Sequence, residues 1–224
     1  ETGPGQVKIA DLDGNGFIDP GNFAVDDHGD LRIIGNQSPR YRYGVNLSAR
    51  WNGIGLSVFL QGVGARDWYP GSDAGMFWGK YGRPFFALIP SIHNYTDDMY
   101  SAERNNWDTA YWPRMTTYQS NGTKNWTRLL EIPNTRYIQS AAYLRVKNIQ
   151  LDYSFPKHIC SAIRLQGLKI YVNAENLFTF TPLHKYAPNF DPEGLSYDSD
   201  FASAADGYTY PILKSVTVGV NITF

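Results

Sequence analysis

The last nine residues constrain the fold more than any other stretch of the chain. Apolar residues alternate there with small or polar ones: Val216, Val218, Val220, Ile222 and Phe224 against Thr217, Gly219, Asn221 and Thr223. A period of two places each set on its own face of a β-strand. A strand of a soluble β-sandwich has the same alternation. A strand that ends the chain on its last apolar residue is more typical of an outer-membrane β-barrel.

A predicted hairpin repeats this pattern near the start of the chain. Over residues 40–51 one face carries Tyr41, Tyr43, Val45, Leu47, Ala49 and Trp51. Aromatic residues at both ends of an apolar series are typical of the girdles of membrane barrels. Asn52-Gly53 follows directly and is a strong signal for a two-residue hairpin turn. We therefore expect a second strand at about 54–64, joined to the first by a very tight turn.

Three more strands are expected in the second half of the chain, at about 136–155, 165–180 and 213–224. The alternation changes phase in the middle of the first of these, which predicts a β-bulge. Residues 156–163 form a short connection between the first and the second. The sequence thus predicts five strands.

The connections between these strands alternate strictly between short and long. They have two residues, about 72 residues (65–136), about eight, and about 32 (181–212). Antiparallel strands joined in this way match a membrane barrel with short periplasmic turns and long extracellular loops. A soluble sandwich rarely contains a loop of about 72 residues. We therefore predict an all-β fold: the last five antiparallel strands of a large transmembrane barrel, with residues 1–30 and both long loops extracellular.

Composition narrows the classes of protein further. The 20 Lys and Arg nearly balance the 21 Asp and Glu, for a net charge of −1, which argues against a nucleic-acid partner. No apolar run approaches the roughly 18 residues of a membrane-spanning helix. The opening residues lack a signal peptide and read like mid-chain sequence, so we expect a piece of a longer protein. Five strands leave two unpaired edges and cannot close a barrel by themselves.

Four stretches of the chain belong together: residues 30–44, 142–156 and 168–181, and the tail Val-Gly-Val-Asn-Ile-Thr-Phe. In this order they resemble the C-terminal part of the SusC/RagA family of TonB-dependent outer-membrane importers. The resemblance implies a barrel of about 22 strands, an N-terminal plug, a TonB-contacting segment and a SusD-like lipoprotein lid. It further implies import of oligosaccharides or peptides across a bacterial outer membrane. Under this resemblance the plug domain is absent from the chain, and Phe224 is the signal for barrel insertion.

An acidic stretch near the start follows the spacing of a calcium-binding loop. The ligands expected from Asp11-Leu-Asp-Gly-Asn-Gly-Phe-Ile-Asp are the side chains of Asp11, Asp13, Asn15 and Asp19 and the main-chain carbonyl of Phe17. Position 12 is Asn22, where an EF-hand has a bidentate Glu, unless Asp26 or Asp27 folds back. The resemblance includes a similar acidic loop. The alternative is an Asx- and Gly-rich turn without metal.

The loop 65–136 contains five of the six tryptophans. Flat aromatic rings stack on sugars and pack against peptide side chains. The residues expected to contact substrate or lid are Trp68, Tyr69, Trp78, Tyr100, Trp107, Tyr111 and Trp112. For any single ring, the alternative is a place in a small core of the loop itself.

Catalysis is not expected. The acidic pairs, such as Asp97-Asp98, lack a defined separation, and the four histidines form no metal or nucleophile motif. An alternative function remains open: a secreted soluble β-sandwich that binds carbohydrate through its aromatic loop. The two hypotheses differ in whether the apolar strand faces meet lipid or a closed protein core.

Overall fold

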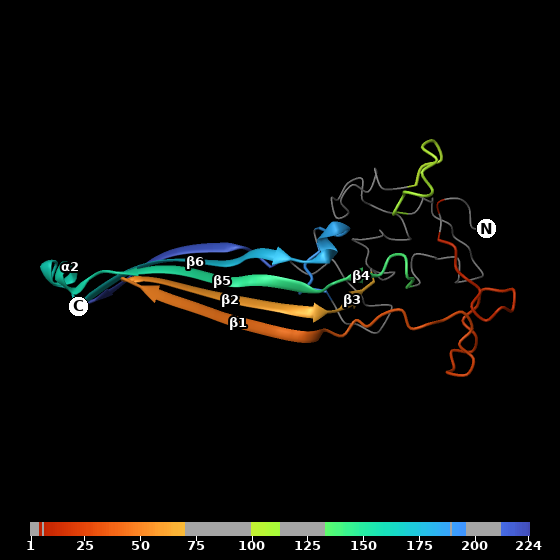
Figure 1. Cartoon of the computed structure of the whole chain (residues 1–224), viewed down its shortest axis with the longest axis horizontal. Coiled ribbons are helices and arrows are strands. Elements are labelled where there is room, and N and C mark those ends of the chain that lie inside the picture. Colours follow the sequence, from red (N-terminus) through yellow and green to blue (C-terminus); the bar gives the residue numbers. More distant parts are fainter. Residues whose placement is uncertain (1–4, 6, 70–99, 113–132, 189, 196–211) are drawn as a thin grey trace. The chain divides into compact units, whose positions relative to one another are not determined.

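The computed structural model describes residues 5, 7–69, 100–112, 133–188, 190–195 and 212–224 (Figure 1). The chain divides into two compact units. The loop unit comprises Glu1–Gln37, Asp67–Gln139 and Leu183–Tyr210, and the strand unit comprises Ser38–Arg66, Ser140–Pro182 and Pro211–Phe224. Predicted contact residue Trp78 and the pair Asp97-Asp98 lie outside the described residues.

The strand unit is one five-stranded antiparallel sheet (Figure 1). Its strands are β1 (Arg40–Trp51), β2 (Ile54–Ala65), β5 (Tyr143–Ser154), β6 (Gly167–Phe180) and β7 (Ser215–Thr223). They lie side by side in chain order. The predicted all-β, antiparallel class is confirmed.

One predicted strand boundary was wrong. The strand expected from residue 136 begins at Tyr143. The preceding residues form β4 (Gln139–Ser140), which pairs with β3 (Asp67–Trp68). Between β4 and β5, Ala141 N donates a hydrogen bond to Arg66 O at 2.8 Å. The chain therefore stops pairing with β3 before β5 begins to pair with β2.

Two short helices complete the described elements. The connection expected at 156–163 contains helix α2 (Lys157–Ala162), which begins directly after Pro156. The 3-10 helix η4 (Pro182–Lys185) belongs mainly to the loop unit. No helix in the described residues is both long enough and apolar enough to cross a membrane.

The hairpin turn between β1 and β2 has the predicted chemistry. Asn52 and Gly53 have φ angles of 47° and 86°, and the pair Trp51 and Ile54 closes the turn. Two successive positive φ angles define a turn whose twist matches that of the flanking strands, which explains the Asn-Gly sequence. Gly53 O also accepts a hydrogen bond from Ser154 N at 2.8 Å, so the turn is tied to β5.

The predicted bulge in β5 is confirmed. The pairing of β5 with β2 shifts between Val146 and Asn148, which leaves Lys147 as the extra residue of that pair. The pairing with β6 shifts at the same place in the opposite sense, because β6 has two residues opposite Lys147. Because one residue is inserted, Arg145 and Asn148 lie on the same face despite their odd separation.

The register gives the sheet two chemically distinct faces. The apolar face is built from rows such as Leu47, Val58, Ile149, Ala174 and Val216. The polar face is built from the neighbouring rows, such as Ser48, Ser57, Gln150, Asn173 and Thr217. Alternation in each strand therefore extends into a continuous apolar surface across five strands.

Candidate functional site

Many of the large side chains of the apolar face are exposed, although Ala174 is buried. Val218 has 73% of its surface exposed, Leu47 55% and Ile222 50%. Among the described residues the strand unit supplies no atoms to cover this face, so it does not form the closed core that a β-sandwich requires. A contiguous apolar surface of this kind marks contact with a membrane or a partner.

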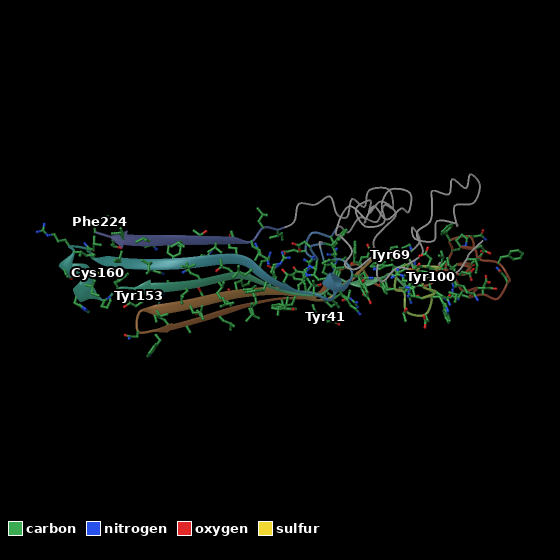
Figure 2. All side chains as sticks on the ribbon, turned by 90° about the horizontal axis from the view of Figure 1, so that it is seen from above. Tyr41, Tyr69, Tyr100, Tyr153, Cys160 and Phe224 are labelled. Carbon is green, nitrogen blue, oxygen red and sulfur yellow. The ribbon has the colours of Figure 1, made fainter. Side chains whose placement is uncertain are left out.

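Aromatic side chains lie at the end of the apolar face that carries the short connections. Trp51 and Tyr153 stand one row from the Asn52-Gly53 turn, and the rings of Tyr153 and Phe155 meet edge to face at 5.0 Å. Figure 2 shows Tyr153 and Phe224 at this same end, with Tyr41 at the opposite end of the strand unit. Phe224 is 81% exposed. Amphipathic rings at both ends of an apolar band match the two interfaces of a lipid bilayer.

The loop unit behaves in the opposite way, because its aromatic side chains pack against one another. Trp112 stacks on Tyr137 with ring centroids 5.8 Å apart, and Tyr111 stacks on Tyr186 at 3.8 Å. Trp68 packs against Phe190 at 5.3 Å. The buried members of this aromatic core are Trp68, Tyr69, Tyr100, Trp112, Tyr137 and Phe190.

Hydrogen bonds hold the tyrosine hydroxyls of this core. Gln139 Nε2 donates to Tyr111 Oη at 2.6 Å, and Asn134 Nδ2 donates to Tyr69 Oη at 2.9 Å. Burial raises the pKa of Tyr69, Tyr111 and Tyr137 above that of an ordinary tyrosine. All three are therefore neutral at physiological pH and act as packing and hydrogen-bonding groups.

A cavity of about 970 Å³ lies within the loop unit. Among the predicted contact residues, its lining includes Tyr100, Trp107, Tyr111 and Trp112. Trp68 and Tyr69 do not line it. Trp107 differs from the others because 69% of its surface is exposed. Of the described candidates, Trp107 is the ring best placed to meet a ligand.

The acidic loop also contributes to this lining, through Leu12, Ile18, Asp19 and Asp30. Within the loop, oxygens of Asp11, Asp13 and Asp30 all lie within 4.8 Å of one another. Asp11 accepts from the main-chain N–H groups of Gly14 at 2.6 Å and Gly16 at 2.8 Å. The three carboxylates offer the oxygen ligands that hard cations prefer.

Other predicted metal ligands are engaged within the loop. Asn15 Nδ2 donates to Asp13 Oδ2 at 3.0 Å and to Asp19 Oδ2 at 3.3 Å. Asn15 Oδ1 accepts from Phe17 N at 2.7 Å. Asn22, at position 12, donates through Nδ2 to Asp27 Oδ2. Neither Asp26 nor Asp27 joins the cluster of three carboxylates.

The acid that does fold back is Asp30, which the spacing did not indicate. Its Oδ1 accepts from Leu12 N at 2.5 Å and its Oδ2 from Asp19 N at 3.0 Å. The hydrogen bond from Leu12 N, followed by weaker contributions from the main chain and Arg32, lowers the pKa of Asp30. Asp30 lies 19 residues after Asp11, outside the 12-residue frame, so no sequence signal marked it.

Comparisons with known proteins point to one class of membrane protein. No family model matches the chain. TonB-dependent receptor P3 of Formosa agariphila is 26% identical over 230 residues, which cover 100% of this chain and 19% of the receptor. TonB-dependent receptor P26 of the same organism is 22% identical, over 98% of this chain and 20% of the receptor. The homologues of this chain are TonB-dependent receptors.

Solved structures agree on the fold. A structure of the RagAB peptide transporter matches with a TM-score of 0.55 and 21% identity, covering 88% of this chain and 18% of that one. A structure of the RagAB peptide importer in a closed-closed state matches with a TM-score of 0.54 and 19% identity, covering 90% and 19%. The resemblance to RagA-like receptors predicted from the sequence is confirmed. The chain spans about a fifth of the length of the proteins that it matches.

Proposed function

We propose that this chain is the C-terminal barrel segment of a TonB-dependent importer in a bacterial outer membrane. The proposal rests mainly on one observation, the continuous and exposed apolar face of a five-stranded antiparallel sheet. Homology to TonB-dependent receptors supports it. In this function the apolar face meets lipid, the polar face lines the barrel, and TonB supplies energy through a part of the receptor outside this chain. No catalytic step is required.

The loop unit supplies the proposed contact with cargo. The exposed ring of Trp107 lines the cavity of about 970 Å³ in this unit. The proposed cargo is an oligosaccharide or a peptide, because exposed aromatic rings bind the faces of sugars and the side chains of peptides. The proposed partner is a SusD-like lipoprotein that closes over the extracellular loops. The peptide transporter among the structural neighbours supports the peptide alternative.

We also propose that the acidic loop holds a calcium ion through Asp11, Asp13 and Asp30. The sequence spacing and the approach of three carboxylates within 4.8 Å both support this site. Asp30 takes the part that the acid at position 12 has in an EF-hand. The ion offsets the mutual repulsion of three negative charges and thereby fixes the wall of the cavity that Leu12 and Ile18 line.

Transport by the intact receptor tests the main proposal. A strain that lacks the receptor gene is complemented with the wild-type gene, and uptake of labelled peptides and labelled oligosaccharides is measured with and without TonB. We expect uptake of one cargo class that depends on both TonB and the receptor. The Trp107→Ala variant should take up less cargo, whereas Phe23→Ala removes an equally exposed ring outside the cavity lining and should not. Recovery of the receptor in the water-soluble fraction would favour the soluble carbohydrate-binding alternative.

Calcium binding is tested separately by isothermal titration of the intact receptor in detergent. We expect Asp30→Asn to weaken calcium binding at least about tenfold, because a ligating charge is lost. Asp26→Asn changes an acid outside the cluster and serves as the matched control. Equal affinities of the two variants would remove Asp30 from the site.

A further inference from the structure

The strands of the sheet carry a surplus of positive charge. Strands β1, β5 and β6 together contain six basic and two acidic residues, a formal charge of 6 − 2 = +4. The basic residues are Arg40, Arg42, Arg50, Arg145, Lys147 and Lys169, and the acidic residues are Asp152 and Glu175. Strands β2 and β7 contain no charged residue. The charge is therefore concentrated on three strands and is not offset by the other two.

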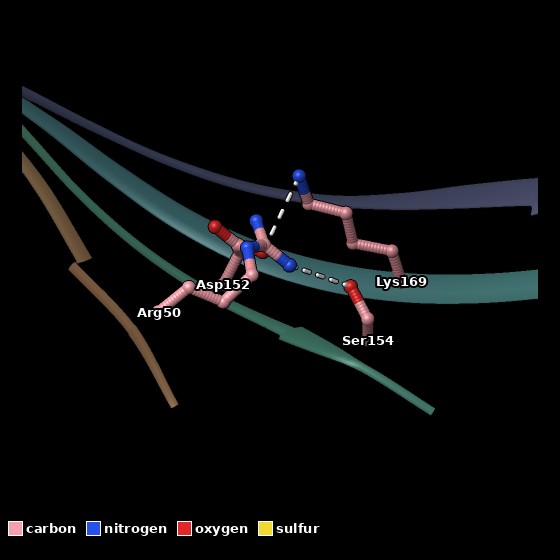
Figure 3. Close-up of polar contacts among 4 residues, drawn as sticks. All are labelled: Arg50, Asp152, Ser154 and Lys169. Carbon is pink, nitrogen blue, oxygen red and sulfur yellow. Dashed lines mark hydrogen bonds and ion pairs between the residues drawn. The ribbon is translucent and has the colours of Figure 1, made fainter. Parts of the chain in front are cut away.

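Two of these basic residues meet one of the acidic residues in a cluster on the polar face (Figure 3). Asp152 Oδ1 lies 3.1 Å from Arg50 Nη2 and 3.3 Å from Lys169 Nζ, so both cations converge on the same oxygen. Arg50 Nη1 also donates to Ser154 Oγ at 3.3 Å. The side chain of Asp152 is only 5% exposed, whereas that of Arg50 is 57% exposed. One carboxylate neutralises one of the two cations, and the cluster carries a net single positive charge.

The sheet is hollowed at this cluster. Gly55 stands between Arg50 and Asp152 in the register. A side chain at Gly55 would meet Asp152 Oδ2 at 2.5 Å and Arg50 Nη2 at 2.9 Å. The glycine therefore makes room for the two charged groups. Beside them lies a hollow of about 340 Å³, lined also by Ser48, Ser57, Gln150 and Lys169. Hydroxyl and amide groups around two cations suit a small anionic guest.

The position of the hollow indicates the source of the guest. Arg50 is one residue from the Asn52-Gly53 turn, and Lys169 follows the connection that contains α2. The hollow therefore lies at the end of the sheet that carries the short connections, whereas the proposed cargo contacts belong to the long connections. About four-fifths of each homologous receptor lies outside the region that this chain matches. The inference rests on the proposed function, under which the remainder of the receptor is available to supply a group to this hollow.

We propose that the hollow between Arg50 and Lys169 seats one carboxylate side chain from a part of the receptor outside this chain. The guest Asp or Glu completes the charge balance of the cluster and joins that part of the receptor to the polar face of β1, β5 and β6. This contact is independent of which cargo the receptor carries.

Zero-length cross-linking of the intact receptor in detergent tests this contact. A water-soluble carbodiimide activates a carboxylate, and the Lys169 amine then displaces the urea to form an amide, so only groups in contact are joined. Mass spectrometry should find Lys169 linked to an Asp or Glu outside residues 1–224. Lys169→Arg keeps the charge but cannot form the amide, so the product should disappear. Arg50→Gln should lower its yield about tenfold, as expected for one charge-assisted hydrogen bond. A product joining Lys169 only to Asp152, or no product, would overturn the proposal.

Cysteine protection gives a second measurement that does not depend on cross-linking yield. Ser57→Cys places a small thiol in the wall of the hollow, opposite Ser48. In the intact receptor this thiol should react slowly with an anionic methanethiosulfonate reagent. Replacing the cross-linked carboxylate by its amide should open the hollow and accelerate the reaction at least about tenfold, more for the anionic than for a cationic reagent. Fast reaction before that replacement would show an empty hollow and contradict the proposal.

Discussion

The loop unit and the strand unit use similar side chains in opposite ways. In the loop unit, Trp112 is 1% exposed and stacks on Tyr137. In the strand unit, Val218 is 73% exposed, and its neighbours Val216 and Val220 on the same face are also exposed. The loop unit therefore provides its own apolar environment and is suited to water. The strand unit lacks one among the described residues, so its apolar environment must come from outside, and the length and girdles of the sheet match a lipid bilayer.

The largest expected effect is in the aromatic core. Trp112→Ala should lower the free energy of unfolding of the loop unit by about 3–5 kcal/mol, because it removes a large buried ring and leaves a cavity. Hydrogen exchange of the intact receptor, read separately for each unit, measures the effect. Exchange in β5 and β6 should change little. Trp107→Ala, at an exposed ring, is the matched control, and an equal loss in both variants would contradict the packing described here.

A charge on the apolar face should have the next largest effect. Leu47→Arg places a cation on this face near the middle of β1, at an expected cost of about 2–4 kcal/mol in a bilayer. Asn46→Arg introduces the same side chain on the polar face of the same strand and should have a smaller effect. The folded fraction of the intact receptor in lipid vesicles, titrated with denaturant, compares the two. A larger loss for Asn46→Arg would reverse the assignment of the faces.

A smaller and selective effect is expected at alkaline pH. Burial raises the pKa of Tyr69 and Tyr137, so the folded loop unit holds these phenols neutral where an unfolded chain ionises them. Their contribution to stability is present below about pH 10 and is lost as the pH rises above it. The loop unit should then exchange faster while the strand unit does not. Tyr137→Phe should reduce this dependence, and an unchanged alkaline profile in that variant would contradict the burial of Tyr137.

The strands could be predicted from the sequence because their signals are local. The alternation at the C-terminus and the Asn52-Gly53 pair each act within a few residues. The start of β5 at Tyr143 could not be predicted, because the bond from Ala141 N to Arg66 O joins residues far apart in the chain. Asp30 was missed for the same reason, since it reaches Leu12 across a fold of the loop.

The aromatic residues show a different limit. Their number in the loop could be read from the sequence, but ring direction depends on tertiary packing. Tyr111 and Trp112 are adjacent in the chain and both contact Tyr137 and Tyr186, whereas Trp107, five residues earlier, remains exposed. No periodicity in an irregular segment distinguishes these rings.

Spin labels along β7 of the intact receptor in bilayers can show directly whether the apolar face contacts lipid, water or protein. Labels at Val216, Val218 and Val220 should be accessible to oxygen, which concentrates in the acyl-chain region, and inaccessible to a water-soluble nickel chelate. Labels at Thr217 and Asn221 should show low accessibility to oxygen, giving a period of two along the strand. Low accessibility to both reagents at all five positions would place this strand inside a protein core and would contradict the membrane assignment.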